Sequence, residues 1–212
     1  TYTLPDYQTQ CGCTDIMMHT MERYFVLEDT MEITDAIAED VMKNVMKYAR
    51  ILKEDPKNYE ARAEIMWCGS LSHNGLTGCG TNGGDWATHL IEHEIGGMFD
   101  VAHGAGLAAV WGSWARYVMD EKIERFVKFA QNVMGVNDRG DNRETALAGI
   151  EAVEAFYKDI KMPVNMRELG VEPTEDEIRE MAEKATNQGS RTIGAFKKLG
   201  VEDLIKIYTA AK

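Results

Sequence analysis

The sequence predicts an all-α fold, with residues 1–212 forming one domain. Apolar residues recur at three- and four-residue spacing along most of the chain, as they do on one face of an α-helix. Pro and Gly gather at the breaks between these runs, and the two-residue alternation of a β-strand is hardly seen. A chain of 212 residues, 44% of them hydrophobic, can bury a sizeable core as a single domain.

Each expected helix is a run of this periodicity between two breaks. Two of the later helices also carry capping-box spacing at their starts, Asp141 with Glu144 and Thr174 with Glu177. In a capping box each side chain accepts a hydrogen bond from an otherwise unpaired N–H group of the first turn, so these two starts are well defined. The expected helices are 15–27, 31–52, 59–71, 86–99, 104–118, 122–133, 143–160, 175–186 and 201–211.

The charge and composition exclude several classes of partner. A formal net charge of -12 and a pI of about 4.9 argue against binding to nucleic acid or to an anionic membrane surface. Neither a secretory signal nor a membrane-spanning segment is expected, because no basic region followed by an apolar run opens the chain and no apolar stretch is long enough. We therefore expect a cytoplasmic protein. Its four cysteines are expected to be free thiols, since a chain of this size needs no disulfide: Cys11, Cys13, Cys68 and Cys79.

The most informative pattern is a set of histidines and one aspartate in two clusters. Asp15 and His19 are four residues apart, so they share one face of a helix, and the same holds for His89 and His93. His103 lies ten residues after His93, past Gly96-Gly97, where a turn can bring it back toward His89. The sequence thus offers Asp15, His19, His89 and His103 as four ligands of one divalent metal ion. One carboxylate and three imidazoles suit Fe(II), Zn(II) or another first-row ion equally.

Other interpretations compete for parts of this pattern. The string His89-Leu90-Ile91-Glu92-His93 matches H-x-x-E-H, in which two histidines hold zinc and the glutamate acts as the base of a hydrolase. That function would leave Asp15, His19 and His103 without a role. A di-iron carboxylate bundle would need Glu-x-x-His pairs on two helices, and the sequence has none. The loop 74–84, rich in Asn and Gly, is either a backbone approach to a ligand or a plain surface loop.

Two segments carry a family resemblance, GCTDIMMHTMERYF and GSLSHNGLTGCGTNGGDWATHLIEHEIGGMFDVAHGAGLAAV. Together with the helices between and after them, they resemble the C-terminal half of the iron-containing, group III alcohol dehydrogenases, and most closely the NAD(P)H-dependent butanol dehydrogenases. The likeness spans essentially all 212 residues, with the spacing Asp-x3-His and then His-x3-His-x9-His complete. It implies the helical metal-binding domain of that family, which is dehydroquinate synthase-like.

The resemblance also implies roles and partners. By position, Asp15, His19, His89 and His103 match the family's metal ligands, whereas His93 matches a histidine that assists proton transfer. The implied reaction is hydride transfer between NAD or NADP and a short-chain alcohol or aldehyde held on Fe²⁺ or Zn²⁺. In the family a Rossmann-like N-terminal domain binds the nicotinamide, and this sequence has no strand–Gly-rich loop–helix unit of the G-x-G-x-x-G type that could do so. The implied intact enzyme is a homodimer, and the chain alone is expected to be inactive.

Two further functions remain open at this level. The chain could be a helical metal-binding module without catalysis, or an H-x-x-E-H zinc hydrolase. Trp67, Trp86, Met98 and Phe99 could select an aliphatic substrate near the ion, although apolar residues at helical spacing more often belong to the core.

Overall fold

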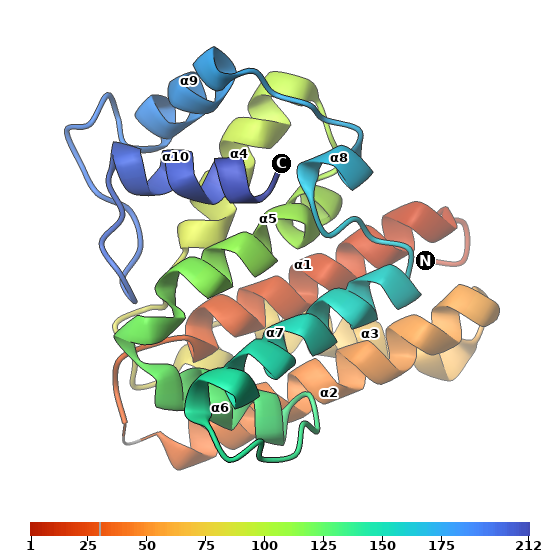
Figure 1. Ribbon diagram of the computed structural model, residues 1–212. Helices are drawn as coiled ribbons and strands as arrows, with labels where there is room; N and C mark the ends of the chain where they lie inside the picture. Colours follow the sequence, from red (N-terminus) through yellow and green to blue (C-terminus); the bar gives the residue numbers. More distant parts are fainter. Residues whose placement is uncertain (30) are drawn as a thin grey trace.

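The computed structural model describes residues 1–29 and 31–212, and these form a helical domain with one isolated β-bridge between Ile193 and Leu199. All nine helices expected from the sequence are present, and the all-α prediction is confirmed (Figure 1). A short helix, α8, and two 3-10 turns, η1 and η2, complete the described elements. In chain order the elements are α1 Asp6–Tyr24, α2 Glu32–Glu54, α3 Tyr59–His73, η1 Leu76–Gly78, α4 Ala87–Phe99, α5 His103–Val118, η2 Met119–Glu121, α6 Ile123–Asn132, α7 Asn142–Asp159, α8 Met166–Leu169, α9 Glu175–Ala185 and α10 Val201–Ala210.

Helix α1 begins nine residues before the expected start at Asp15, and this is the largest boundary error. Its first half carries polar residues and Gly12 where a core-facing helix usually carries apolar residues. Two of these polar side chains, Thr9 and Gln10, are nevertheless buried, because groups on other helices pair with them. Gln10 donates to the carbonyl oxygen of Ala49 at 3.0 Å, and Arg62 donates to Oγ1 of Thr9 at 3.0 Å. Such bonds depend on tertiary contacts that periodicity does not report.

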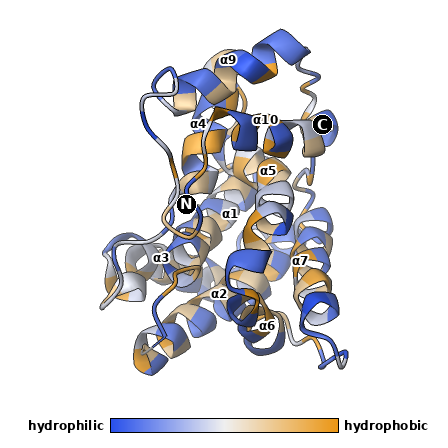
Figure 2. Ribbon diagram, turned by 60° about the vertical axis from the view of Figure 1, so that its left-hand side comes forward, coloured by the Kyte–Doolittle hydropathy of each residue, from blue (hydrophilic) through white to orange (hydrophobic). Residues whose placement is uncertain are grey.

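Helices α1 and α5 form the centre of the domain. Helix α1 packs against α2, α3 and α5, while α5 also contacts α4, α7 and α10. The small residues at the start of α5 allow a close approach, since a Cβ at Gly104 would lie 2.1 Å from the carbonyl oxygen of Cys11. Outer helices such as α6 and α7 carry hydrophobic and hydrophilic residues on opposite faces (Figure 2). The α1–α5 crossing therefore fixes how the two sequence clusters meet.

An aromatic cluster fills the core at the end of α1. Phe25 stacks on Phe126 with ring centroids 4.4 Å apart, and Trp111, Trp114 and Phe129 pack around this pair within 6.3 Å of Phe25. All five side chains are almost fully buried. Aromatic groups of this size bury large apolar areas, so this cluster is a major part of the core that holds α1, α5 and α6 together.

Local signals define the helix ends as the sequence indicates. Thr174 and Glu177 form a complete capping box at α9, and the side chain of Asp141 accepts a hydrogen bond from the backbone N–H of Glu144 at the start of α7. All four cysteines are free, and three of them are buried. No helix within the described residues is long and apolar enough to cross a membrane.

Candidate metal centre

The structure brings together the four side chains that the sequence suggests as ligands. Asp15 and His19 lie one turn apart on α1, His89 lies in the first turn of α4, and His103 is the first residue of α5. The Nε2 atoms of the histidines surround one carboxylate oxygen, Oδ1 of Asp15. They lie 3.7 Å from it in His19, 3.5 Å in His89 and 3.4 Å in His103.

These separations suit atoms that share a metal ion better than atoms that share a hydrogen bond. An N–H···O hydrogen bond is usually about 2.7–3.2 Å long. Ligand atoms placed tetrahedrally around an ion, each about 2.0–2.1 Å from it, lie about 3.4 Å from one another. Oδ1 of Asp15 and Nε2 of His89 are buried and have no hydrogen-bond partner among the described residues. Unpaired buried polar atoms are rare, so these residues fit a divalent metal ion.

Two buried glutamates contact the Nδ1 atoms of His89 and His103 and so orient these rings. The carboxylate of Glu22 pairs with Nδ1 of His89, and that of Glu92 pairs with Nδ1 of His103. A carboxylate on Nδ1 keeps the proton there and leaves Nε2 free to bind an ion. Sequence reasoning missed Glu22, although it follows Asp15 by seven residues and so lies two turns along the same face of α1.

Glu22 also closes the start of helix α4. Its Oε1 accepts hydrogen bonds from the backbone N–H groups of Thr88, at 2.7 Å, and His89, at 3.2 Å. Its backbone oxygen accepts from the N–H of Asp85 at 2.8 Å. The residue before α4, Trp86, provides no side-chain cap of its own. A carboxylate from α1 therefore fills the place of a helix cap and fixes α4 relative to the metal site.

The electrostatics of the site follow from these contacts. Burial lowers the pKa of His89, but the neighbouring carboxylates of Asp15 and Glu22 outweigh it and raise the pKa to about 9. The carboxylate of Asp15 beside its Nε2 and that of Glu92 on its Nδ1 raise the pKa of His103 to about 10. Burial lowers the pKa of His19 to about 4. At neutral pH the metal-free site therefore holds protons on His89 and His103, and a metal ion must displace them.

His93 lies beside the four central residues. It is exposed on α4, with its ring centroid 6.1 Å from that of His89 and 5.5 Å from that of His103. Its potential ligand atoms group with those of Glu92 and His103, within 4.8 Å, whereas Asp15 groups with His19 and His89. The glutamate of the H-x-x-E-H string is almost fully buried and faces Nδ1 of His103. This geometry favours an orienting role for Glu92 over that of a hydrolase base.

Trp86 forms one side of the site. Its ring lies 5.2 Å from His19 and 5.3 Å from His89, centroid to centroid, and the guanidinium of Arg23 lies 4.7 Å over it. The backbone of Trp86 has φ of 62°, which is uncommon for a bulky residue, and its Nε1 donates to the oxygen of Gly83 at 2.6 Å. Strained backbone of this kind often occurs at functional sites.

A family model for the Fe-containing alcohol dehydrogenase family, C-terminal, matches residues 9–212. The chain belongs to this family. It is 35% identical to NADH-dependent butanol dehydrogenase A of Clostridium acetobutylicum over 209 residues, which cover 98% of this chain and 53% of that protein. It is 28% identical to the NADPH-dependent aldehyde reductase YqhD of Escherichia coli over 212 residues, covering 100% of this chain and 54% of that protein.

Solved structures of the family agree with this fold. The substrate- and cofactor-free aldehyde reductase YqhD from E. coli superposes with a TM-score of 0.93 at 28% identity, over 100% of this chain and 55% of that one. NADH-dependent butanol dehydrogenase A from Thermotoga maritima superposes with a TM-score of 0.90 at 34% identity, over 99% of this chain and 53% of that one. The chain thus spans about half the length of the relatives it matches, and it matches the family's C-terminal part.

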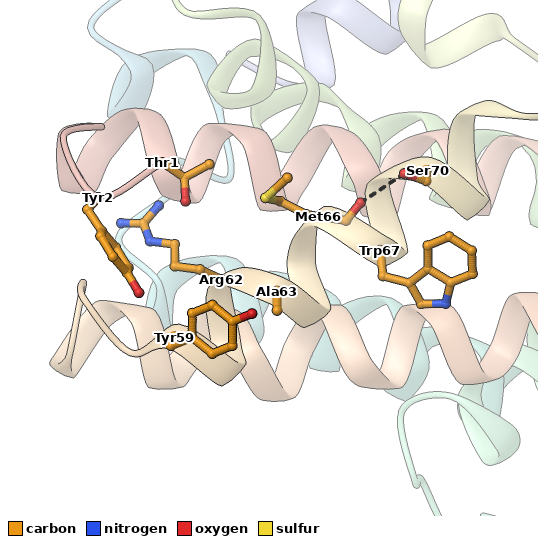
Figure 3. A pocket seen from close by; sticks show the side chains of 8 residues that line it. All are labelled: Thr1, Tyr2, Tyr59, Arg62, Ala63, Met66, Trp67 and Ser70. Atoms are coloured by element: carbon orange, nitrogen blue, oxygen red, sulfur yellow. Dashed lines mark hydrogen bonds between the residues drawn. The ribbon is translucent and has the colours of Figure 1, made fainter.

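A separate groove of about 510 Å³ runs along the exposed face of α3 (Figure 3). It contains none of the four predicted ligands, and Trp67, 61% exposed, belongs to it and not to the metal centre. Met98 and Phe99 are half-buried and pack against the core. Among the described interactions, Trp86 is therefore the one of the four suggested substrate-selecting residues that contacts the central histidines. The groove is lined by Thr1, Tyr2, Tyr59, Arg62, Ala63, Met66, Trp67 and Ser70.

Proposed function

We propose that this chain is the metal-binding catalytic half of an NAD(P)-dependent alcohol dehydrogenase that also reduces aldehydes. The observation that carries the proposal is the convergence of three imidazole Nε2 atoms on one oxygen of Asp15, from three different helices. Relatives are named as butanol dehydrogenases and an aldehyde reductase, with NADH or NADPH as their coenzyme. Short-chain alcohols and aldehydes are therefore the substrate class that we propose.

Asp15, His19, His89 and His103 would hold a divalent ion, either Fe²⁺ or Zn²⁺. An ion bound there acts as a Lewis acid toward the oxygen of an alcohol or aldehyde. The protein supports that chemistry by holding its ligands in one protonation state. The carboxylates on Nδ1 of His89 and His103 keep both Nε2 atoms available and limit how far the rings can turn.

His93 is the residue to which we assign proton transfer. The interconversion of an alcohol and an aldehyde moves a proton as well as a hydride, and an imidazole near the reacting oxygen can carry that proton. His93 is exposed, so its ring nitrogens can exchange protons with solvent. It also lies beside His89 and His103 without facing the Asp15 carboxylate. Its position thus supports a role at the rim of the site.

The nicotinamide cofactor would be held mainly by a second half. The string Gly78-x-Gly80-x-x-Gly83 follows helix α3 and the turn η1 and not a β-strand, so the described residues contain no strand–glycine-rich loop–helix unit of the dinucleotide-binding type. The chain also matches only the C-terminal part of its relatives. We propose an N-terminal Rossmann-like domain as the partner of this chain. The chain alone should then bind a metal ion and catalyse little or no turnover, because the hydride donor or acceptor would have no site.

A chimeric enzyme tests this proposal. The matching C-terminal part of the C. acetobutylicum butanol dehydrogenase A is replaced by this chain, and NADH-dependent reduction of butyraldehyde is measured together with the metal content. We expect turnover in the chimera, loss of metal in the Asp15→Ala/His103→Ala variant, and retained metal with much lower turnover in His93→Ala.

The other functions give different results in the same experiment. A chimera that folds and binds metal without turnover would support a metal-binding module instead. Peptide cleavage by the chain that disappears in Glu92→Gln, with metal loss in His93→Ala, would support the H-x-x-E-H hydrolase.

A further inference from the structure

One face of helix α3 is exposed although it carries large apolar side chains. Tyr59, Met66 and Trp67 are 76%, 60% and 61% exposed, and with Tyr2 they line the groove of about 510 Å³ (Figure 3). None of the eight residues that line this groove is acidic, in a chain whose formal net charge is -12. Tyr, Trp, Met and Arg are the residue types enriched at protein interfaces, and exposed apolar patches mark interaction surfaces.

This face of α3 leads to the metal centre. Five residues at three- or four-residue spacing lie along it: Tyr59, Ala63, Met66, Ser70 and His73. The ring of His73 lies against that of His19, with centroids 3.9 Å apart, and its Nε2 lies 3.5 Å from Oδ2 of Asp15. The face therefore runs from the groove to the edge of the metal site, over about 20 Å of helix.

The opposite end of the groove is formed by the first residues of the chain. Thr1 and Tyr2 line it together with Tyr59 and Arg62 (Figure 3). The chain matches the C-terminal part of its family and 53% of the C. acetobutylicum butanol dehydrogenase A. In a protein built like that relative, most of the remaining half precedes Thr1 and so joins this domain beside the groove.

We propose that the exposed face of α3 is the docking surface for the N-terminal cofactor domain. Two requirements meet on this face. The polypeptide of that domain joins at Thr1, and a nicotinamide held by it must reach a substrate at the metal centre, next to His73, because hydride passes only between atoms in contact. A domain that meets both conditions lies along α3 and covers Met66 and Trp67. This inference rests on the proposed function and adds the surface on which its two halves meet.

Hydroxyl-radical labelling with mass spectrometry tests this surface without any assay of turnover. The chain alone is compared with the chimera in which it follows the N-terminal half of the C. acetobutylicum enzyme. Labelling of Met66 and Trp67 should fall several-fold in the chimera, whereas Ile33, 77% exposed near the start of α2, should keep its labelling. Unchanged labelling of Met66 and Trp67 would overturn the proposal. Protection that appears in the chain alone as its concentration rises would also overturn it, because the occupant would be a second copy.

Two matched variants separate the docking surface from the metal site. Met66→Asp places a charge at the centre of the face, and Ile33→Asp places the same charge on an exposed apolar residue elsewhere. In the chain alone both variants should melt as the parent does and bind Co²⁺ as tightly. In the chimera Met66→Asp should lower NADH-dependent turnover by about fivefold or more, while Ile33→Asp leaves it unchanged.

The outcomes distinguish the docking surface from the proposed function. Equal turnover in the Met66→Asp and Ile33→Asp chimeras would contradict the docking surface and leave the proposed function intact. A parent chimera without turnover, or an Asp15→Ala chimera that keeps full turnover, would contradict the proposed function, and the labelling of Met66 and Trp67 would still decide whether the face is covered.

Discussion

Replacement of Glu22 by Gln should weaken metal binding while the helical fold persists. The carboxylate is 1% exposed, and it pairs with Nδ1 of His89 through one oxygen and with two N–H groups of α4 through the other. An amide cannot satisfy both sides. If the NH2 group of the glutamine faces Nδ1, the imidazole must carry its proton on Nε2, which then cannot bind an ion. If the amide oxygen faces Nδ1, the NH2 group faces the N–H groups of α4, and two sets of donors meet without an acceptor.

The size of this effect follows from the contacts. Orienting partners of metal-bound histidines are worth about 10- to 100-fold in affinity, which corresponds to about 1.4–2.8 kcal/mol. We expect a loss in this range for Glu22→Gln, measured by chelator competition with Co²⁺ or Zn²⁺. Glu39→Gln is a matched control, because Glu39 is also buried and accepts hydrogen bonds from Tyr24 and Asn132 without touching a ligand. Parent-like affinity in Glu22→Gln would refute the orienting role.

Three other perturbations test the packing and the charges of the site. Gly104→Ala should lower the thermal stability of the domain and weaken metal binding, because its Cβ would lie 2.1 Å from the carbonyl oxygen of Cys11 and push α5 away from α1. Gly97→Ala, which has open space around its Cβ, should change neither the melting temperature nor the metal affinity measured by titration. Metal affinity should rise by about tenfold or more per pH unit between pH 6 and 7.5, because the pKa values of His89 and His103 are raised to about 9 and 10 and the metal ion must displace their protons. Calorimetry in buffers of different ionisation enthalpy should show the released protons, and a pH-independent affinity would contradict this. Asp35→Asn should lower the free energy of unfolding by about 3–5 kcal/mol in urea and leave the Co²⁺ spectrum unchanged, since it breaks a buried pair with Arg125 away from the site.

The parts of the molecule that the sequence predicts well are those that depend on neighbours along the chain. Helix periodicity gives all nine expected helices, and the four-residue spacing of Asp15 and His19 places both on one face of α1. Helix starts with their own caps, such as Thr174, are also predicted correctly. The start of α1 is not, because its polar residues are paired with side chains and carbonyls on other helices.

The same distinction separates the ligands from the residues that orient them. A histidine pair four residues apart is visible in any sequence, whereas Glu22 becomes an orienting residue only when α4 begins against the C-terminal end of α1. The contact between the ends of α3 and α1, where Arg23 donates to the backbone oxygen of Ser72, likewise has no signal in the sequence. These contacts depend on how the helices cross, and the crossing of α1 and α5 depends in turn on a residue with no side chain, Gly104. Substitutions that change the crossing should therefore alter metal affinity without touching any ligand, and Gly104→Ala is the sharpest of them.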